Sequence, residues 1–427
     1  MSNQHETSVT RRDFVRTAAA ASIAATFPAN FNVFAQGSDA FKVGVIGCGG
    51  RGTGAAIDCL RADPAVEIVA LGDLVPDRVE SSLAKLMKEF PTRVKVPASN
   101  RFTGFDNYNG VLSVPGVNLI VTAAPPGFRP IHVKAAVEAG KHVFMEKPVA
   151  VDPVGIRSII ATSELAARKK LALVAGTQRR HQQRYLEMMK RIQDGQIGEI
   201  VAAQVYWNQG DLWVKEHLPG MSEIEWQCRN WLYFSWTSGD HIVEQHVHNI
   251  DVANWAMGVM PKNVMGMGGR QVRVGPQYGN IFDHFAVEFE YPNGVRVTSM
   301  CRQTKGCNDR VEERIVGTKG VAWSTSSATR ITGAAPWTFE AEETNPYVQE
   351  HIDLIASIRK GAPLNEGRQV AESTLCAIMG RMSAYTGRAL SWDWAMNTST
   401  LDLSPAKYEF GPNPVHPVAV PGTTPLV

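Results

Sequence analysis

Hydrophobic positions in the first part of the chain alternate between two periods. Short apolar runs rich in β-branched residues are separated by segments with helical spacing; the runs are FKVGVI (41–46), EIVALGD (67–73), VNLIVTAAPP (117–126) and HVFMEKP (142–148). This alternation predicts right-handed βαβ units around a parallel sheet that helices cover on both faces. Asp152 followed by Pro153 is typical of a helix start. We expect this α/β domain to span residues 38–165.

The pattern changes after residue 166. HFAVEFEYPNGVRVTSM (284–300) alternates apolar and polar residues on both sides of Pro-Asn-Gly, which is typical of an antiparallel hairpin. EERIVGTKGVAW (312–323) predicts another strand pair that turns between Gly317 and Gly320. We therefore expect an α+β domain with an open, mainly antiparallel sheet over residues 166–345. Helices and a Pro-rich extended tail over residues 346–427 should pack on both domains.

The first 36 residues have a different composition. Arg11 and Arg12 precede an alanine-rich, weakly apolar run in TRRDFVRTAAAASIAATF (10–27), and small residues near Ala35 offer a cleavage site. The arginine pair predicts a twin-arginine export signal over residues 1–36, which implies the twin-arginine translocase as a transient partner and a periplasmic location. A basic N-terminus followed by a short helix is the alternative.

Charge and composition narrow the class of partner. The formal net charge is +2 and the sequence has no Lys/Arg-rich tract, so no nucleic-acid partner is expected. The sequence has no run of 18 or more apolar residues, so no membrane span is expected. The open sheet face indicates a homo-oligomer. The six cysteines show no C-x-x-C spacing, and we expect buried free thiols, with a Cys301–Cys307 pair as the alternative.

The segment VGVIGCGGRGTG (43–54) places Gly47, Gly49 and Gly52 between a strand and a helix. An acidic residue, Asp73, follows Gly52 by 21 positions at the end of the second strand. In this context the glycines let the backbone approach a pyrophosphate, and the helix N-terminus favours its charge. Asp73 would accept hydrogen bonds from ribose hydroxyls and repel a 2′-phosphate, which favours NAD over NADP. A glycine turn with an unrelated surface aspartate is the alternative.

A second chemical signal is Glu146-Lys147-Pro148 at the end of a predicted parallel strand. Ligands bind at the carboxyl edge of such sheets, so Lys147 could donate to a substrate hydroxyl or transfer its proton. A solvated loop lysine would fit these residues equally well.

The glycine loop, TAAPPGFRPIHVKAAVEAGKHVFMEKPVA (122–150) and GTKG (317–320) together resemble the Gfo/Idh/MocA oxidoreductases, the family of glucose–fructose oxidoreductase and inositol dehydrogenase. The resemblance covers most of the chain and is strongest over residues 42–160. It implies an N-terminal Rossmann domain, an open-sheet domain that carries the substrate, and a catalytic Lys147 at the junction of cofactor and sugar. The residues expected at the cofactor are Gly47, Gly49, Gly50, Arg51, Gly52, Asp73, Pro125, Glu146 and Lys147.

The family's second motif, Asp-x-x-x-His followed by a further Asp, resembles GDHIVEQHVHNIDVANWAMG (239–258). Glu244 and His248 stand four residues apart, on one helical face if the segment is helical, and Asp251 follows. Glu244 replaces the usual Asp, and His246 replaces a usual Gly. The resemblance implies that His248 accepts or delivers the hydroxyl proton. It also implies a catalytic role for Glu244, whose side chain is longer than that of the usual Asp and therefore places the carboxylate differently.

Other polar and aromatic residues near these motifs leave alternatives open. His241, His246 and His248 with Glu244 could bind a metal, but their spacing matches no known metal signature and we expect none. Arg180 and His181 in GTQRRHQQRY (176–185), with Asp251, could contact the substrate, or the arginine loop could be solvated. Tryptophans could stack on sugar rings or pack in the core; they are Trp207, Trp213, Trp226, Trp231 and Trp236.

These features together predict an NAD-dependent oxidoreductase that acts on a hydroxyl of a sugar, glycoside or polyol, with hydride transfer to and from a tightly bound nicotinamide. One alternative is an NAD-dependent glycoside hydrolase or lyase that oxidises, eliminates and reduces in one cycle. Another is a sugar-sensing protein that retains the fold without catalysis.

Overall fold

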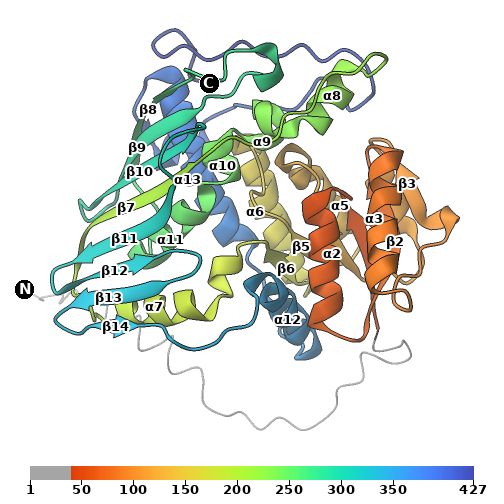
Figure 1. The fold of residues 1–427 in the computed structure, drawn as a ribbon, viewed down its shortest axis with the longest axis horizontal. Coiled ribbons are helices and arrows are strands. Elements are labelled where there is room, and N and C mark those ends of the chain that lie inside the picture. Colours follow the sequence, from red (N-terminus) through yellow and green to blue (C-terminus); the bar gives the residue numbers. More distant parts are fainter. Residues whose placement is uncertain (1–39) are drawn as a thin grey trace, which may run out of the picture. The chain divides into compact units, whose positions relative to one another are not determined.

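The computed structural model describes residues 40–427. The expected export signal, with Arg11 and Arg12, lies outside these residues. Two β-sheets organise the described part of the chain, and each has its own set of helices (Figure 1). Among the described residues, no helix combines the length and apolar character that a membrane crossing requires.

The first sheet is parallel throughout. Within the described chain its six strands lie in the order β3-β2-β1-β4-β5-β6. They are β1 (Phe41–Ile46), β2 (Val66–Asp73), β3 (Arg101–Thr103), β4 (Leu119–Thr122), β5 (His142–Met145) and β6 (Leu173–Ala175). The strand order reverses between β1 and β4, and open α/β sheets bind ligands at the carboxyl ends of strands at such a point. The prediction of a parallel sheet is confirmed.

Helices cover both faces of this sheet. One apolar cluster joins the strands to α2 (Gly50–Ala62), α3 (Pro76–Glu89) and α12 (Pro346–Arg359). A second cluster joins them to α4 (Asn107–Ser113), α5 (Arg129–Glu138) and α6 (Pro153–Arg168). Successive strand residues point to opposite faces, so Val45 of β1 enters the first cluster and Ile46 the second. Helix α6 begins where the sequence predicts, because the Asp152 side chain accepts a hydrogen bond from Gly155 N.

Strand β6 lies beyond residue 165, where the first domain was expected to end. The apolar run LALVA (171–175) marks the strand in the sequence. The strand belongs to the first sheet because it pairs in parallel with β5, with Val143 opposite Leu173 and Met145 opposite Ala175. That pairing spans thirty residues and a helix, so local periodicity does not reveal it.

The second sheet is mainly antiparallel, as predicted. In the described chain its nine strands lie in the order β14-β13-β12-β11-β7-β10-β9-β8-β15, and β7 with β10 is the parallel pair. They are β7 (Ile200–Gln209), β8 (Asn263–Gly269), β9 (His284–Glu290), β10 (Arg296–Gln303), β11 (Arg310–Gly317), β12 (Gly320–Ser324), β13 (Thr329–Gly333), β14 (Trp337–Thr338) and β15 (Leu390–Ser391). Both expected hairpins, β9–β10 and β11–β12, are present.

Helices pack on one face of the second sheet and leave the other face open (Figure 1). The helices of this half are α7 (Gln183–Gln193), α8 (Glu223–Arg229), α9 (Ser235–Ser238), α10 (His241–Glu244), α11 (Val247–Met257), α13 (Gly367–Thr386) and α14 (Trp392–Asn397). On the opposite face Met265 and Met267 of β8 are 61% and 71% exposed. The expectation of a homo-oligomer stays a prediction.

The cysteines are free thiols, and Cys48, Cys59, Cys228, Cys301 and Cys376 are buried. Cys307 is exposed, contrary to the expectation of burial, because it lies in the loop between β10 and β11.

A buried carboxylate joins the second sheet to the helices beneath it. Glu313 of β11 is fully buried, and it accepts hydrogen bonds from Arg179 Nη1, Tyr185 Oη, Asn249 Nδ2 and Ser324 Oγ. Burial raises the pKa of the Glu313 carboxyl, and the charge of Arg179 and the hydroxyl and amide donors act against this rise. These donors come from the loop before α7, from α7, from α11 and from β12, so a single side chain fixes all four segments.

We expect Glu313→Ala to lower the free energy of unfolding by about 3–5 kcal/mol, because it leaves the Arg179 charge buried without a partner. Denaturant unfolding followed by circular dichroism measures the change. The matched control is Glu288→Ala on β9, whose carboxylate pairs with Arg296 on the exposed face and should cost about 1 kcal/mol or less. Equal losses in the two variants would contradict the role assigned to Glu313.

Candidate active site

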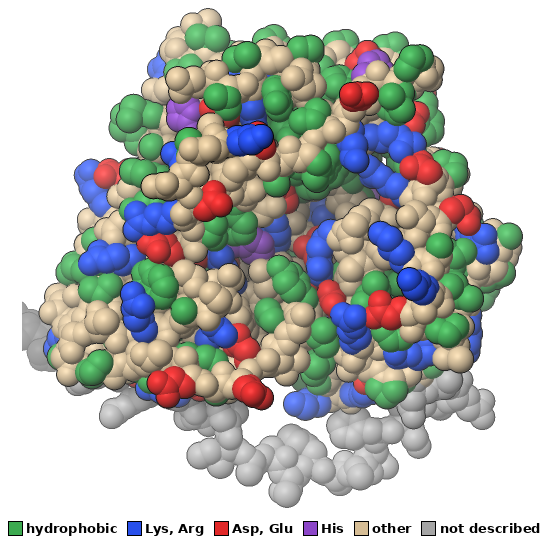
Figure 2. All heavy atoms as spheres, viewed as in Figure 1, with side chains coloured by type: hydrophobic (Ala, Val, Ile, Leu, Met, Phe, Trp, Pro, Cys, Tyr) green, Lys and Arg blue, Asp and Glu red, His purple; other side chains and the backbone are tan. Residues whose placement is uncertain are grey.

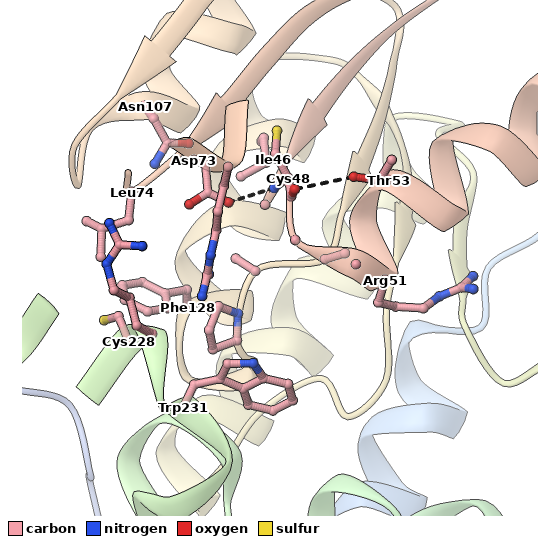
Figure 3. A pocket seen from close by; sticks show the side chains of 18 of the residues that line it. Ile46, Cys48, Arg51, Thr53, Asp73, Leu74, Asn107, Phe128, Cys228 and Trp231 are labelled. Atoms are coloured by element: carbon pink, nitrogen blue, oxygen red, sulfur yellow. Dashed lines mark hydrogen bonds between the residues drawn. The ribbon is translucent and has the colours of Figure 1, made fainter. Parts of the chain in front are cut away.

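A cavity of about 410 Å³ opens at the carboxyl edge of the parallel sheet (Figure 3). One wall comes from the glycine loop after β1, from Asp73 and Leu74 after β2, and from the loop after β4, including Pro125. Basic side chains line the same cavity: Arg78, Lys85, Lys215 and Arg229. Figure 2 shows a hollow on this face with Lys and Arg side chains along its rim. A positively charged cavity at the strand-order reversal suits an anionic ligand.

The glycine loop has the shape that a dinucleotide requires. Gly47 has φ +91°, and a Cβ there would lie 2.3 Å from Ala124 N. A Cβ on Gly52 would lie 1.8 Å from the Gly47 carbonyl oxygen, so this glycine allows α2 to approach the strand. A Cβ on Gly49 or Gly50 would meet nothing within 4 Å, which leaves that side of the loop open to a ligand. Helix α2 begins at Gly50, so its positive N-terminal end faces the cavity.

Asp73 stands at the end of β2 as predicted, and the structure gives it an additional contact. Its Oδ2 accepts a hydrogen bond of 2.7 Å from Cys48 N in the glycine loop, and its Oδ1 accepts one of 3.2 Å from Val75 N. Burial raises the pKa of this carboxyl, and the nearby Arg78 charge opposes the rise. Asp73 therefore shapes the loop as well as lining the cavity.

Arg51 lies at the rim of the cavity, and its side chain extends toward α12 (Figure 3). Its Nε donates to Glu146 Oε1, its Nη1 lies 3.5 Å from Asp58 Oδ2, and its Nη2 lies 3.7 Å from Glu350 Oε1. Among the described residues neither oxygen of the buried Glu350 has a hydrogen-bond partner, and burial raises the pKa of this carboxyl well above its usual range. Arg51 and Glu146, both expected at the cofactor, thus contact each other.

Lys147 and Glu244 meet although they are 97 residues apart. Lys147 follows β5, and its Nζ donates a 2.6 Å hydrogen bond to the Glu244 carbonyl oxygen at the end of α10. Nζ also lies 3.5 Å from Glu244 Oε1. Glu244 Oε2 is buried and has no hydrogen-bond partner among the described residues, so it is an acceptor that a substrate hydroxyl could satisfy.

Glu244 and His248 do not share a helix, so the condition for a common helical face is not met. Helix α10 ends at Glu244 and α11 begins at Val247. The chain turns at His246, whose buried ring contacts Ser299 Oγ at 2.7 Å in the second sheet. A histidine in place of the usual glycine thus adds a side chain that anchors this turn.

His248 lies buried on α11 against Trp207 of β7, with ring centroids 5.8 Å apart. Burial, and then the positive charge of Lys147, hold the pKa of His248 well below its usual value of about 6.5. The imidazole is therefore neutral at pH 7, and its unprotonated nitrogen can accept a hydrogen bond from a substrate hydroxyl.

The three tentative substrate residues bind other parts of the chain. Arg180 makes a bidentate pair with Asp251 at 2.8 and 2.9 Å, and Asp251 also accepts from Gln369 and Ser373. His181 Nδ1 lies 2.7 Å from Asp353 Oδ2, and its Nε2 lies 3.2 Å from Glu366 Oε1. Although burial opposes it, these carboxylates raise the pKa of His181 to about 10.

The histidines of the possible metal site have separate partners. His241 Nδ1 lies 3.0 Å from Asp240 Oδ1, whereas His246 contacts Ser299. In the described part of the chain no group of three or more His, Cys, Asp or Glu residues is arranged to hold a metal ion.

Core packing is confirmed for two of the tryptophans, and stacking on sugar rings stays a prediction. Trp213 and Trp231 line the cavity, whereas Trp226 and Trp236 pack in a core cluster. Sequence reasoning did not identify several cavity residues, because no motif marks them: Arg78, Lys85, Phe105, Asn107, Phe128, Lys215 and Arg229.

Two protein-family models match successive parts of the chain. "Oxidoreductase family, NAD-binding Rossmann fold" matches residues 41–177, and "GFO/IDH/MocA C-terminal domain" matches residues 185–323. The chain belongs to the Gfo/Idh/MocA family. Its first domain is an NAD-binding Rossmann domain, which the shape of the glycine loop and the basic cavity fit.

Individual Gfo/Idh/MocA relatives are distant. An inositol 2-dehydrogenase/D-chiro-inositol 3-dehydrogenase of Lactiplantibacillus plantarum is 25% identical over 257 residues, or 60% of this chain and 63% of that protein. A glycosyl hydrolase family 109 protein of Streptomyces niveus is 32% identical over 148 residues, or 34% of this chain and 29% of that protein. The chain thus spans less than two thirds of the length of either relative.

Among solved Gfo/Idh/MocA structures, scyllo-inositol dehydrogenase from Lactobacillus casei with bound NAD(H) and scyllo-inositol shares the fold. The TM-score is 0.63 at 18% identity, over 82% of this chain and 99% of that one.

We expect Asp73→Ala to weaken NAD binding about ten-fold or more, because a lost charge-assisted hydrogen bond costs roughly 1.5–3 kcal/mol. The preference for NAD over NADP should narrow, since the charge that repels a 2′-phosphate is gone. Calorimetry with both dinucleotides measures this. Asp73→Asn removes the charge and keeps an acceptor for Cys48 N, so it separates ribose binding from loop shape. Unchanged NAD affinity in both variants would remove Asp73 from the cofactor site.

We expect Lys147→Ala and His248→Ala each to lower kcat by roughly 10²- to 10⁴-fold while NAD binding persists, as for loss of a general acid or base. Because the Lys147 charge helps to depress the pKa of His248, Lys147→Met should also raise that pKa in an NMR titration. The control is His284→Ala, an exposed histidine on β9, which should retain normal turnover. Near-normal kcat in either site variant would contradict its assigned role.

Proposed function

We propose that this protein is an NAD-dependent oxidoreductase acting on a hydroxyl group of a sugar, glycoside or polyol. The observation that carries the proposal is the convergence of three groups at the carboxyl end of β5, the strand that pairs with β4; none of the three lines the cavity itself. Lys147 Nζ, the unpartnered Glu244 Oε2 and the neutral ring of His248 come together from β5, α10 and α11. A donor, an acceptor and a proton-accepting base suit a substrate with adjacent hydroxyls.

Bound NAD supplies the acceptor and donor of hydride. Oxidation of an alcohol also releases the hydroxyl proton, which the neutral His248 ring accepts. Lys147 Nζ donates a hydrogen bond to the substrate oxygen, and Glu244 orients Lys147 through its carbonyl oxygen. Glu244 and His248 are buried and the Lys147 side chain is 11% exposed, so little water reaches these interactions and they are stronger than in bulk solvent.

The proposed substrate class draws on the relatives. The Lactiplantibacillus plantarum relative is an inositol dehydrogenase, and the solved neighbour binds scyllo-inositol with NAD(H). The glycoside hydrolase alternative has weaker support, because the family 109 protein matches over only 29% of its length. Incubation with a panel of inositols, aldoses and glycosides, followed by mass spectrometry, tests the proposal. Oxidised product supports oxidoreduction, whereas released aglycone without oxidised sugar would favour the alternative.

We also propose that Arg11 and Arg12 direct export of the folded protein to the periplasm. A periplasmic enzyme has no dependable pool of free NAD. Because the protein folds before export, it can bind the dinucleotide in the cytoplasm and carry it across the membrane. Each cycle must then restore the cofactor in place, by reducing a second substrate or by completing an internal oxidation and reduction.

We expect the purified protein to carry close to one NAD(H) per chain through gel filtration. Acid extraction followed by chromatography measures the bound dinucleotide. Replacing Arg11 and Arg12 by lysine should leave this ratio unchanged and retain the protein in the cytoplasm, because the pair acts as an address. Protein that purifies empty, and that converts added NAD steadily to free NADH with one sugar, would overturn the idea of a retained cofactor.

A further inference from the structure

The dinucleotide cavity has a second wall that does not come from the Rossmann domain. Trp213, Lys215, Cys228, Arg229 and Trp231 line it, and all lie between β7 and α9 in the second half of the chain (Figure 3). We call residues 211–233 the covering segment. It faces the part of the cavity beside β2 and α3. In the parallel sheet β2 and β5 lie on opposite sides of the β1–β4 pair, so this part is separated from Lys147 by two strands. This is the side where Asp73 is expected to bind the adenosine ribose.

The covering segment is held in shape by its own hydrogen bonds. The Tyr233 hydroxyl donates to the carbonyl oxygens of Leu212 and Trp213 at 3.1 and 3.0 Å. Trp226 Nε1 donates to the Lys215 carbonyl oxygen at 2.9 Å, and Lys215 N donates to Asn230 Oδ1 at 2.8 Å. The covering segment is therefore an ordered part of the fold that is stabilised by internal hydrogen bonds.

One ion pair fastens the covering segment to the Rossmann domain. The Arg229 guanidinium makes a bidentate contact with Asp77 in the first turn of α3, at 3.0 and 2.8 Å. The hydrogen bonds from Arg229 lower the pKa of Asp77 below its usual value. Because the Asp77 side chain is 62% exposed, this contact can open and close at modest cost.

The C-terminal chain lies across the outside of this wall and beside α8 (Figure 1). Gln227 and Asn413 exchange hydrogen bonds of 2.6 and 2.8 Å, and Ile224 N donates to the Gly411 carbonyl oxygen. Tyr408 and Phe410 pack on two aromatic rings that line the cavity, with centroids 5.5 Å apart for Phe128–Tyr408 and 5.2 Å apart for Phe105–Phe410. We call residues 403–413 the C-terminal strap.

The strap lies outside both matched family regions, the second of which ends at residue 323. It is without helix or strand, so its course depends on the contacts with the covering segment, with Phe105 and Phe128, and with Asp152, which accepts from Leu403 N. One apolar cluster includes residues of the strap, of the covering segment and of the Rossmann domain. Moving the wall therefore requires breaking the strap contacts as well as the Arg229–Asp77 pair.

We propose that the covering segment and the C-terminal strap form a clamp over the adenosine half of the bound dinucleotide and set the rate at which it leaves. The inference rests on the proposed function. It adds a physical reason for cofactor retention: the dinucleotide is released only when the second wall separates from α3 and from the rings at Phe105 and Phe128.

Stopped-flow fluorescence measures NADH release from the loaded protein after mixing with excess competing NAD. In the strap variant Tyr408→Ala/Phe410→Ala we expect the dissociation rate to rise ten-fold or more. In Arg229→Gln, which removes one partly exposed ion pair, we expect a two- to five-fold rise. The matched control is Val415→Ala, an exposed residue of the same C-terminal chain, which should release NADH at the unaltered rate.

Hydrogen exchange gives a second readout that is independent of turnover. Amides of residues 403–413 and 211–233 should exchange more slowly when NAD is bound, and this protection should decrease in the strap variant. If the strap variant fails to fold, Arg229→Gln still tests the clamp through the dissociation rate. NAD binding with unchanged release in the folded variants would overturn the clamp and leave the proposed function standing. Failure of the unaltered protein to bind NAD would overturn the proposed function itself.

Discussion

The buried carboxylate of Glu313 is the constraint on which the arrangement of the second domain depends. Because a fully buried charge must be paired and hydrogen-bonded, Arg179, Tyr185, Asn249 and Ser324 have to reach one point beneath the sheet. Asn249 is the neighbour of His248 on α11, and Val311, two residues before Glu313 on β11, pairs with Trp207 of β7. The contact that anchors the helices to the sheet therefore also sets where His248 lies.

A second network, centred on the partly exposed Arg51, joins the cofactor loop to the end of β5. Arg51, in the first turn of α2, contacts Glu146 after β5 and approaches Glu350 of α12. Glu146 precedes Lys147, so the position of the lysine is coupled to the glycine loop through one guanidinium. Gly176 packs closely against the same carboxylate. A Cβ on Gly176 would lie 2.4 Å from Glu146 Oε2, so only glycine fits there. The Arg51–Glu146 contact thus links the cofactor loop to the residue that precedes Lys147.

The cavity and the group around Lys147 have different physical character. Beside β5 the groups are buried, few and chemically specific, as expected where hydroxyl chemistry takes place. Beside β2 the cavity is basic and aromatic, and its outer wall comes from segments of the second half of the chain. The proposed function assigns the basic cavity to the cofactor and the buried groups beside β5 to the substrate.

The sequence by itself determined the features that depend on neighbouring residues: the parallel and antiparallel sheets, the glycine loop with Asp73, the helix start at Asp152 and the place of Lys147 at a strand end. These follow from periodicity and turn chemistry within a few residues. Only the tertiary structure decided that Glu244 and His248 lie on separate helices, that Arg180 pairs with Asp251, and that Trp231 rather than Trp226 faces the cavity. Each of these depends on contacts between segments tens of residues apart, where packing and the pairing of buried charges select among side-chain arrangements that local sequence leaves open.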